Sequence, residues 1–178
     1  DSVANNSNFT LHGMNSSNWK NCVDGNCLWF DGVDDYGEVN VADWLGNFTV
    51  SQWVWANTTS QPNYASTFAI DNNASSSQSF QHMISGGKWK LHNNQTKSFG
   101  DVVPQKWTHL VTVFDSGYVR QYMDGVLVNS NFYPNCSLNN FDLYKIGVNR
   151  AGNSYFEGMI DNVLIWDAAL RNSSITVL

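Results

Sequence analysis

Charged side chains are scarce in this chain of 178 residues: Asp, Glu, Lys and Arg make up 13% of it, about half the usual share. The nine lysines and arginines are scattered singly, which leaves no basic stripe for nucleic acid and no polybasic patch for a membrane surface. No apolar run approaches the roughly 20 residues of a membrane-spanning helix. The sequence therefore predicts neither a nucleic-acid partner nor a membrane span.

Cysteine is also rare, with three residues in the chain. Cys22 and Cys27 flank the turn-rich link Val-Asp-Gly-Asn, across which a disulfide is sterically reasonable. A metal site there is disfavoured, because no second Cys or His pair stands at ligand spacing. Cys136 is left over, as a buried free thiol, as an alternative partner for one of the first two cysteines, or as a bond to another chain.

Asparagine and serine are abundant, and Asn-x-Ser/Thr sequons run from end to end of the chain, at Asn5, Asn8, Asn15, Asn47, Asn57, Asn73, Asn94, Asn135 and Asn172. A chain of this composition forms some sequons by chance. Sequons matter only where a protein meets a glycosylation machinery, which means a secreted or surface protein. Their density predicts an extracellular glycoprotein with several N-linked glycans.

Short alternating segments separated by turns dominate the pattern. The stretch 48–55 is typical, with Val50 and Val54 on one face and Trp53 on the other. About a dozen such segments, and a helical pattern only near the C-terminus, predict an antiparallel β-sandwich. We expect one domain over 1–178, in which 1–21 is an irregular lead-in with one short strand.

The longest predicted strand, 155–170, lies near the C-terminus. Its expected partner is the early strand 27–32, because a late strand that pairs with an early one closes a β-domain and hides both edges. Gly158 within the long strand indicates a bulge or a close backbone contact. We expect the two strands to share a core cluster of Leu28, Phe30, Ile160, Val163 and Ile165.

Four stretches resemble, in family order, motifs of laminin G-like domains in the concanavalin A-like lectin/glucanase superfamily: FDG-x-DDY at 30–36, nFTvsxW at 47–53, W-x-H followed by Y-x-DG within 107–125, and iG followed by f-x-G-x-iD within 146–161. The resemblance covers essentially the whole chain and extends to the pentraxins. It implies a two-sheet antiparallel jelly roll. It leaves the function open, because the superfamily holds lectins, glycosidases, adhesion modules and structural parts.

The resemblance also implies a place for a structural ion near the opening and closing strands. Asp31, Asp34 and Asp161 are the candidate calcium ligands there, since calcium prefers several carboxylate oxygens. The alternative is that these side chains cap turns by accepting hydrogen bonds from backbone N–H groups. Structural calcium is the one cofactor that the sequence suggests.

Sugar binding would use exposed aromatic rings with hydrogen-bonding groups at their rims. The candidate ligand-binding aromatics are Trp55, Trp89 and Tyr122, which lie on predicted strands. The alternative is that these rings fill the space between the two sheets.

Catalysis is not indicated. A glycoside hydrolase needs two carboxylates about 5–10 Å apart on one face. Glycosidases of the superfamily carry them in E-x-D-x-x-E, and neither Glu38 nor Glu157, the two glutamates of the chain, stands in that pattern. The expected function is a non-enzymatic structural or assembly subunit that self-associates into a surface layer or filament. The alternative is a lectin-like module that binds carbohydrate or protein, and a glycoside hydrolase is the third reading.

Overall fold

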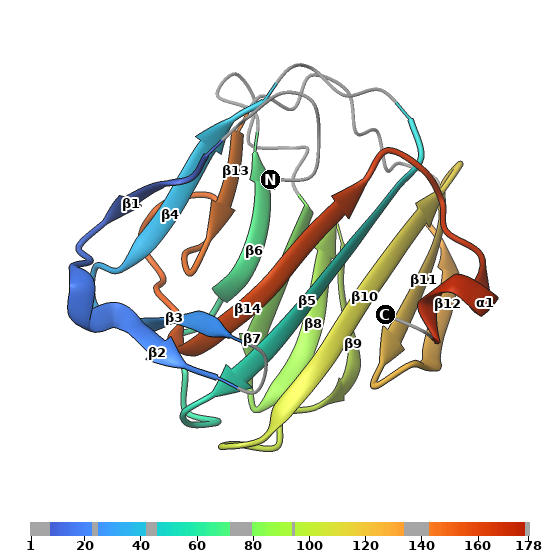
Figure 1. Ribbon diagram of the computed structural model, residues 1–178. Helices are drawn as coiled ribbons and strands as arrows, with labels where there is room; N and C mark the ends of the chain where they lie inside the picture. The colour runs from blue at the N-terminus through green and yellow to red at the C-terminus, as the bar shows by residue number, and fades with distance from the viewer. Residues whose placement is uncertain are drawn as a thin grey trace.

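Two antiparallel sheets of seven strands each pack face to face in this computed structural model, which describes residues 8–22, 25–41, 46–71, 80–93, 95–133 and 143–176 (Figure 1). The first sheet consists, in spatial order, of β1 (Thr10–His12), β4 (Tyr36–Asn40), β13 (Leu143–Ile146), β6 (Ala65–Asp71), β7 (Phe80–Ser85), β8 (Lys88–Asn93) and β9 (Gln95–Asp101). The second consists of β12 (Val126–Phe132), β11 (Tyr118–Met123), β10 (Trp107–Asp115), β5 (Phe48–Ala56), β14 (Glu157–Trp166), β3 (Asn26–Asp31) and β2 (Trp19–Asn21). The predicted antiparallel sandwich is confirmed.

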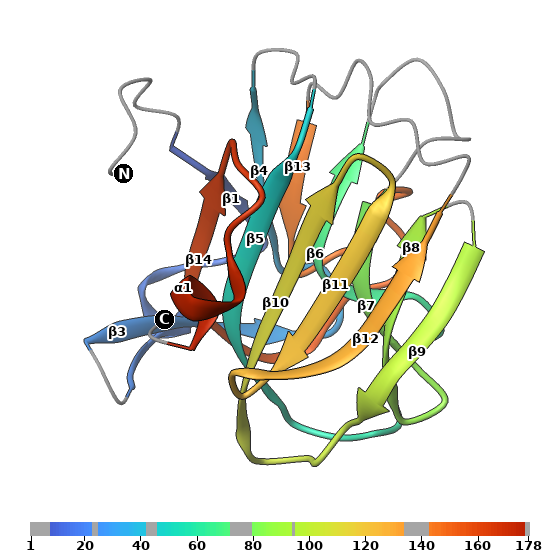
Figure 2. The ribbon, with the colours of Figure 1, turned by 90° about the vertical axis from the view of Figure 1, so that its right-hand side faces the viewer.

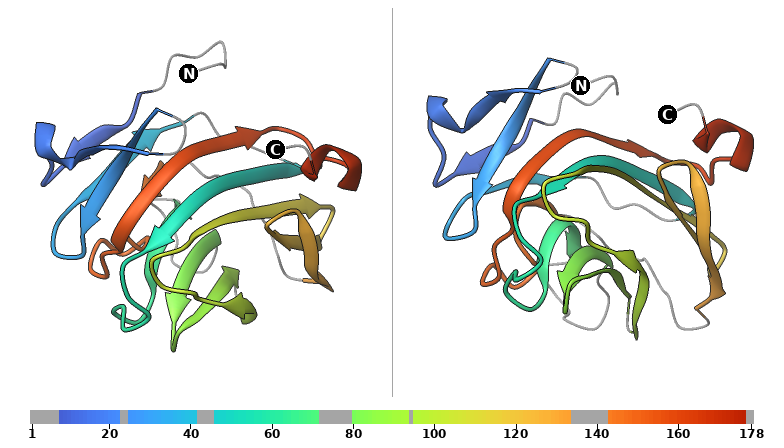
Figure 3. Two further views of the ribbon diagram at one scale, coloured as in Figure 1. Left: turned by 60° about the horizontal axis from the view of Figure 1, so that its bottom comes forward. Right: turned by 90° about the horizontal axis from the view of Figure 1, so that it is seen from below.

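The second sheet arches over the first, as the view from below shows (Figure 3). A short helix, α1 (Asn172–Ile175), lies on the outer side of the second sheet (Figure 2). The sequence pattern predicts a brief helix at 173–178, one residue later than the start of α1. In the described part of the chain no helix is long and apolar enough to cross a lipid bilayer.

The closing strand β14 lies between β3 and β5 and runs antiparallel to both. Gly158 lies opposite Phe30 of β3, so the predicted pairing of a late strand with an early one is confirmed. The strand is shorter than the predicted 155–170, because the chain leaves the sheet after Trp166. Beyond that point the side-chain hydroxyl of Thr49 on β5, rather than a backbone N–H group, donates to the carbonyl oxygen of Ala168 at 2.8 Å.

The lead-in is more regular than predicted. In its described part, β1 pairs with β4 of the first sheet and β2 pairs with β3 of the second, with a 3₁₀ turn at Ser16–Asn18 between them. The one short strand predicted in the lead-in is β1, whereas β2 was not predicted, because edge pairing uses backbone hydrogen bonds and needs no apolar pattern. The lead-in thus covers one edge of each sheet.

The predicted core cluster is confirmed. Phe30 and Ile160 are buried, and the other three predicted members, Leu28, Val163 and Ile165, are partly buried against the same core. The ring centroids of Phe30 and Phe156 lie 6.4 Å apart, within the range of aromatic pairs. This packing fixes β3 and β14 side by side.

Candidate functional site

Among the described residues, the C-terminal segment covers one half of the outer face of the second sheet. There the C-terminal segment packs Ile175 against Val111 and Val113 of β10 and Tyr122 of β11. The hydroxyl of Tyr122 donates to the Asn172 side-chain oxygen at 2.5 Å. The strands β3, β14 and β5 and the start of β10 lie outside this small second core.

Four large side chains form a row across this second half of the face: Trp29 on β3, Met159 on β14, Trp55 on β5 and Trp107 on β10. Each is half-buried. Three strand spacings of about 4.8 Å make the row about 14 Å long. Trp53, two residues before Trp55, lies on the same face, because alternate residues of a strand share a face. We call Trp29, Trp53, Trp55, Trp107 and Met159 the tryptophan face.

Trp29 and Trp55 lean toward each other. Their strands are separated by β14, which sets the backbones about 9.6 Å apart. The ring centroids nevertheless lie only 6.1 Å apart, with the ring planes tilted by 53°. The two indoles therefore converge over Met159, whose sulfur is 4.0 Å from the sulfur of Cys22.

Trp53 is held by a stack with His109, its neighbour across β5 and β10. The ring centroids are 4.8 Å apart and the planes differ by 19°. Nε2 of His109 lies 2.7 Å from the hydroxyl of Ser51. Burial lowers the pKa of His109, and the nearby Asp124 partly offsets that effect. The imidazole thus serves as a mainly neutral platform for the indole.

Carboxylates border the tryptophan face. Glu157, Met159 and Asp161 alternate along β14, so both acids flank the row. Asp31 of β3 lies directly opposite Glu157. The Nδ2 atom of Asn57 donates to Oε1 of Glu157 at 2.5 Å, which orients that carboxylate at the end of the row.

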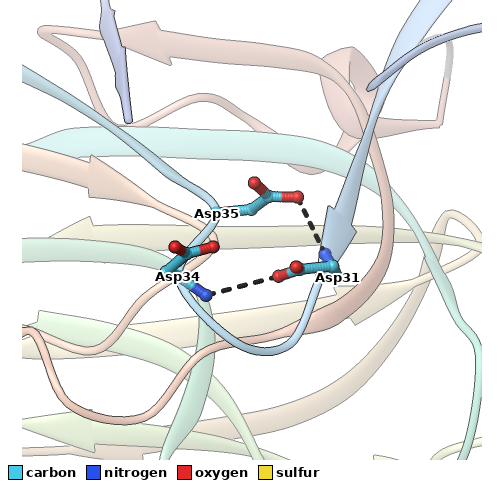
Figure 4. Close-up of side chains that lie close together, drawn as sticks. All are labelled: Asp31, Asp34 and Asp35. Atoms are coloured by element: carbon cyan, nitrogen blue, oxygen red, sulfur yellow. Dashed lines mark hydrogen bonds between the residues drawn. The ribbon is translucent and has the colours of Figure 1, made fainter. Parts of the chain in front are cut away.

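The loop after β3 carries an acidic cluster (Figure 4). Oδ1 of Asp31 accepts hydrogen bonds from the backbone N–H groups of Val33 and Asp34, at 2.8 and 3.3 Å. Oδ2 of the buried Asp35 accepts from Asp31 N at 3.1 Å and from Asn18 Nδ2 at 2.7 Å. Burial, and then the charge of Asp31, raise the pKa of Asp35. The turn-capping alternative is therefore what the structure shows for Asp31.

The three candidate calcium ligands do not come together. Ligand atoms of Asp31, Asp34 and Asp35 lie within 4.8 Å of one another, whereas Asp161 lies in β14 opposite Trp53. The expected grouping was wrong because the resemblance indicates that the loop after β3 lies near β14 but does not say which residue of β14 is opposite Asp31. That residue is Glu157, not Asp161. Asp35 was not among the predicted calcium ligands, although it follows Asp34 directly in the sequence. Two oxygens bound to one calcium at about 2.4 Å span at most this distance, so the spacing of these three carboxylates meets one requirement of a calcium site, which takes about six to eight oxygens in all.

Two of the three predicted sugar-binding aromatics are buried. Trp89 is 1% exposed and lies in the core between the sheets, and Tyr122 is 2% exposed beneath the C-terminal segment. Neither ring is presented to solvent, so these two predictions were wrong. The polar neighbours of Trp89 along β8, Lys88 and Lys90, signal that Trp89 points inward. Trp55 belongs to the tryptophan face, whereas Trp29, Trp107 and Met159 were missed.

The predicted covalent features are a disulfide and N-linked glycans. Cys22 and Cys27 are joined, and Cys136 lies outside the described residues. Among the sequons, Asn8, Asn15 and Asn172 are exposed, Asn47 and Asn57 are half-buried, and Asn5, Asn73, Asn94 and Asn135 lie outside the described residues. Glycosylation stays a prediction.

Solved structures of other proteins have a fold similar to that of this chain. The chain resembles domain 4 of AbnA, an extracellular GH43 arabinanase of Geobacillus stearothermophilus in complex with arabinotriose, at 20% identity and a TM-score of 0.72, over 89% of this chain and 79% of that one. It also resembles the binding domain of botulinum neurotoxin serotype G, at 14% identity and a TM-score of 0.76, over 99% of this chain and 47% of that one.

A third similar structure, at 14% identity and a TM-score of 0.70, comes from work on botulinum neurotoxin type C, whose cell entry depends on interaction with two ganglioside molecules; it matches over 96% of this chain and 45% of that one. The chain thus spans about half the length of the toxin chains. No match is found among curated protein sequences. A sequence model of the concanavalin A-like lectin/glucanases superfamily matches residues 31–176. Because that match covers most of the chain, the protein belongs to the concanavalin A-like lectin/glucanase superfamily.

Proposed function

We propose that this chain is a non-catalytic, lectin-like module of an extracellular protein and that it binds carbohydrate on the tryptophan face. The observation that carries the proposal is the row of Trp29, Met159, Trp55 and Trp107 with carboxylates at its border. Sugar rings pack their C–H faces on indoles, and carboxylates accept hydrogen bonds from sugar hydroxyls. The similar structure in complex with arabinotriose supports carbohydrate as the ligand class.

The carboxylates of the face favour binding over hydrolysis. Glu157 and Asp161 are four residues apart on one strand, about 14 Å along it, which exceeds the spacing of a glycosidase pair. Asp31 lies opposite Glu157, but its Oδ1 accepts hydrogen bonds from two turn amides, and Glu157 accepts one from Asn57. These bonds orient both carboxylates and leave lone pairs that can accept hydrogen bonds from sugar hydroxyls.

An extracellular location agrees with the Cys22–Cys27 disulfide, since such bonds persist mainly in oxidising compartments. N-linked glycans as partners, and self-association into a surface assembly, stay predictions for the same protein. A carbohydrate-binding module that is displayed many times on a surface would combine both roles.

Replacing Trp55 with alanine should weaken glycan binding at least about tenfold, because Trp55 lies at the centre of the row and its removal also frees Trp29. Isothermal titration against soluble arabinan, xylan and glucan fragments measures the loss. Trp19→Ala is the matched control, since Trp19 is 52% exposed on β2 and lies outside the tryptophan face. Equal losses in the two variants, or no glycan bound by the wild type, would contradict the proposal.

Structural calcium stays a prediction for the loop that carries Asp31, Asp34 and Asp35. A bound ion stabilises the fold by mass action, by about 2.7 kcal/mol at a concentration 100 times the dissociation constant. We therefore expect the melting temperature to rise in excess calcium over chelator, and Asp34→Asn to abolish that rise. An unchanged melting temperature would leave these carboxylates with their turn-capping role alone.

A further inference from the structure

We propose that the tryptophan face selects uncharged, linear oligosaccharides and rejects anionic ones. The inference rests on the proposed function and adds the ligand class. It follows from the charges that surround the row, since the indoles themselves pack equally well against neutral and acidic sugar rings.

Negative charge gathers at one end of the row. Asp31 of β3 lies opposite Glu157 of β14. On the outer face, Asp31 is the next side chain along β3 after Trp29, and Glu157 is the next side chain along β14 before Met159. The exposed Asp34 and the buried Asp35 follow in the adjoining loop. Along a strand, residues on the same face are about 7 Å apart, so a ligand that lies on the indoles above Met159 passes between Glu157 on one side and Asp161 on the other.

The acids at this end are held by neutral groups. Within the described residues, Asp31 accepts hydrogen bonds from backbone amides and Glu157 from Asn57, and none of the ion pairs found there includes either of them. The cation beside Trp107 is Lys106, and its ammonium group lies 3.5 Å from a carboxylate oxygen of Asp124. Lys20 of β2 lies opposite Cys27, on the other side of Trp29 from Asp31. When no calcium ion is bound in the adjoining loop, the end of the row at Asp31 and Glu157 is therefore negative.

This field acts on any charged sugar that lies on the row. At about 7 Å and a solvent-like dielectric, each carboxylate weakens the binding of a sugar carboxylate about threefold, so Asp31 and Glu157 together weaken it about tenfold. Salt reduces the effect, because the Debye length is about 8 Å at physiological ionic strength. The row is about 14 Å long and crosses the strands, which suits an extended chain of a few sugar units.

The test compares neutral arabinan, xylan and glucan trimers with oligogalacturonate trimers by isothermal titration, at low and at physiological salt. We expect at least one neutral trimer to bind about tenfold or more tightly than the anionic trimer at low salt. This gap in affinity should narrow with added salt. Glu157→Gln combined with Asp161→Asn should narrow it at low salt, because both substitutions keep a hydrogen-bond acceptor and remove the charge. Asp101→Asn is the matched control, since Asp101 is an exposed acid on β9 of the other sheet, paired with Lys88.

The outcomes separate this inference from the function on which it rests. Binding of the anionic trimer as tightly as the neutral ones, or a gap that neither salt nor the double variant changes, overturns charge selection while the lectin-like function stands. If the wild type binds no trimer of either kind and no longer fragment, the proposed function itself fails.

Discussion

Replacing Gly158 with alanine is expected to cost more than about 3 kcal/mol of unfolding free energy. A Cβ atom at this position would lie 2.2 Å from the backbone carbonyl oxygen of Trp55 and 2.7 Å from the ring of Phe156. The carbonyl cannot retreat without opening the pairing of β14 with β5 in the middle of the second sheet. Proteins of this size are stable by only about 5–15 kcal/mol, so the loss is a large share of the total.

Urea denaturation followed by circular dichroism measures the loss. Gly152→Ala is the control, because Gly152 has a positive φ of 70° and a Cβ atom added there would meet nothing within 4 Å. We expect the control to cost only about 1–2 kcal/mol, the ordinary strain of a side chain in the left-handed region. If both variants unfolded at the same urea concentration, the close approach at Gly158 would not constrain the fold.

Gly158 also shows how far the sequence could be interpreted. A glycine inside an apolar strand indicates either a bulge or a close backbone contact, and the sequence offers no way to choose. The structure places the close contact at Gly158 and the register shift later, between Asp161 and Leu164, where Asn162 has a φ of 46°. The choice depends on which residue of β5 lies opposite, and that register is a property of the assembled sheet.

The candidate site could also be predicted only in part: the sequence indicates which face of a strand a residue is on, but not which strands are neighbours. Alternation within β5 correctly separates inward Val50 and Val54 from outward Trp53. Alternation does not say which strands are neighbours, so Trp29 and Trp107 could not be placed beside Trp55 from the sequence. The row arises from the order β3, β14, β5, β10, in which the first two strands come from opposite ends of the chain.

Polar edge strands were missed for a related reason. β9 (Gln95–Asp101) has one buried side chain, Phe99, and pairs with β8 through its backbone. β2 has none. Sequence periodicity reports burial of side chains, and an edge strand with little burial leaves no such signal.

Acid should destabilise the protein well above the pH at which its carboxylates titrate, because of a histidine in the core. His82 is fully buried between the sheets. Nε2 of Gln52 donates to its Nδ1 at 2.8 Å and also donates to the hydroxyl of Thr67 at 2.8 Å. Because Nδ1 is the acceptor, the ring proton of the neutral imidazole is on Nε2, which donates to the hydroxyl of Thr112 at 2.6 Å. This arrangement requires the neutral imidazole.

The direction of the pH effect follows from linkage. Burial lowers the pKa of His82 from 6.5 to about 3. Between these values the unfolded chain binds a proton that the native protein does not, so the unfolding free energy falls as the pH falls below about 6.5. The slope is up to about 1.4 kcal/mol per pH unit, and the full loss by pH 3 is about 5 kcal/mol. Burial lowers the pKa of His92 and of His109 as well, which adds losses of the same sign.

His82→Gln isolates the contribution of the core histidine, because glutamine keeps hydrogen-bonding groups and does not titrate. Urea denaturation between pH 4.5 and 7.5 should show a wild-type loss that exceeds the loss of the variant by about 1.4 kcal/mol for each pH unit below 6.5. If the variant folds too poorly for comparison, NMR titration of the wild type is decisive, since the His82 ring signals should stay those of a neutral imidazole down to about pH 4, whereas a normally titrating His would change near pH 6.5. A ring that protonates near pH 6.5 in the folded protein would show that the network of Gln52, His82 and Thr112 opens to solvent, and the acid sensitivity would then have another source.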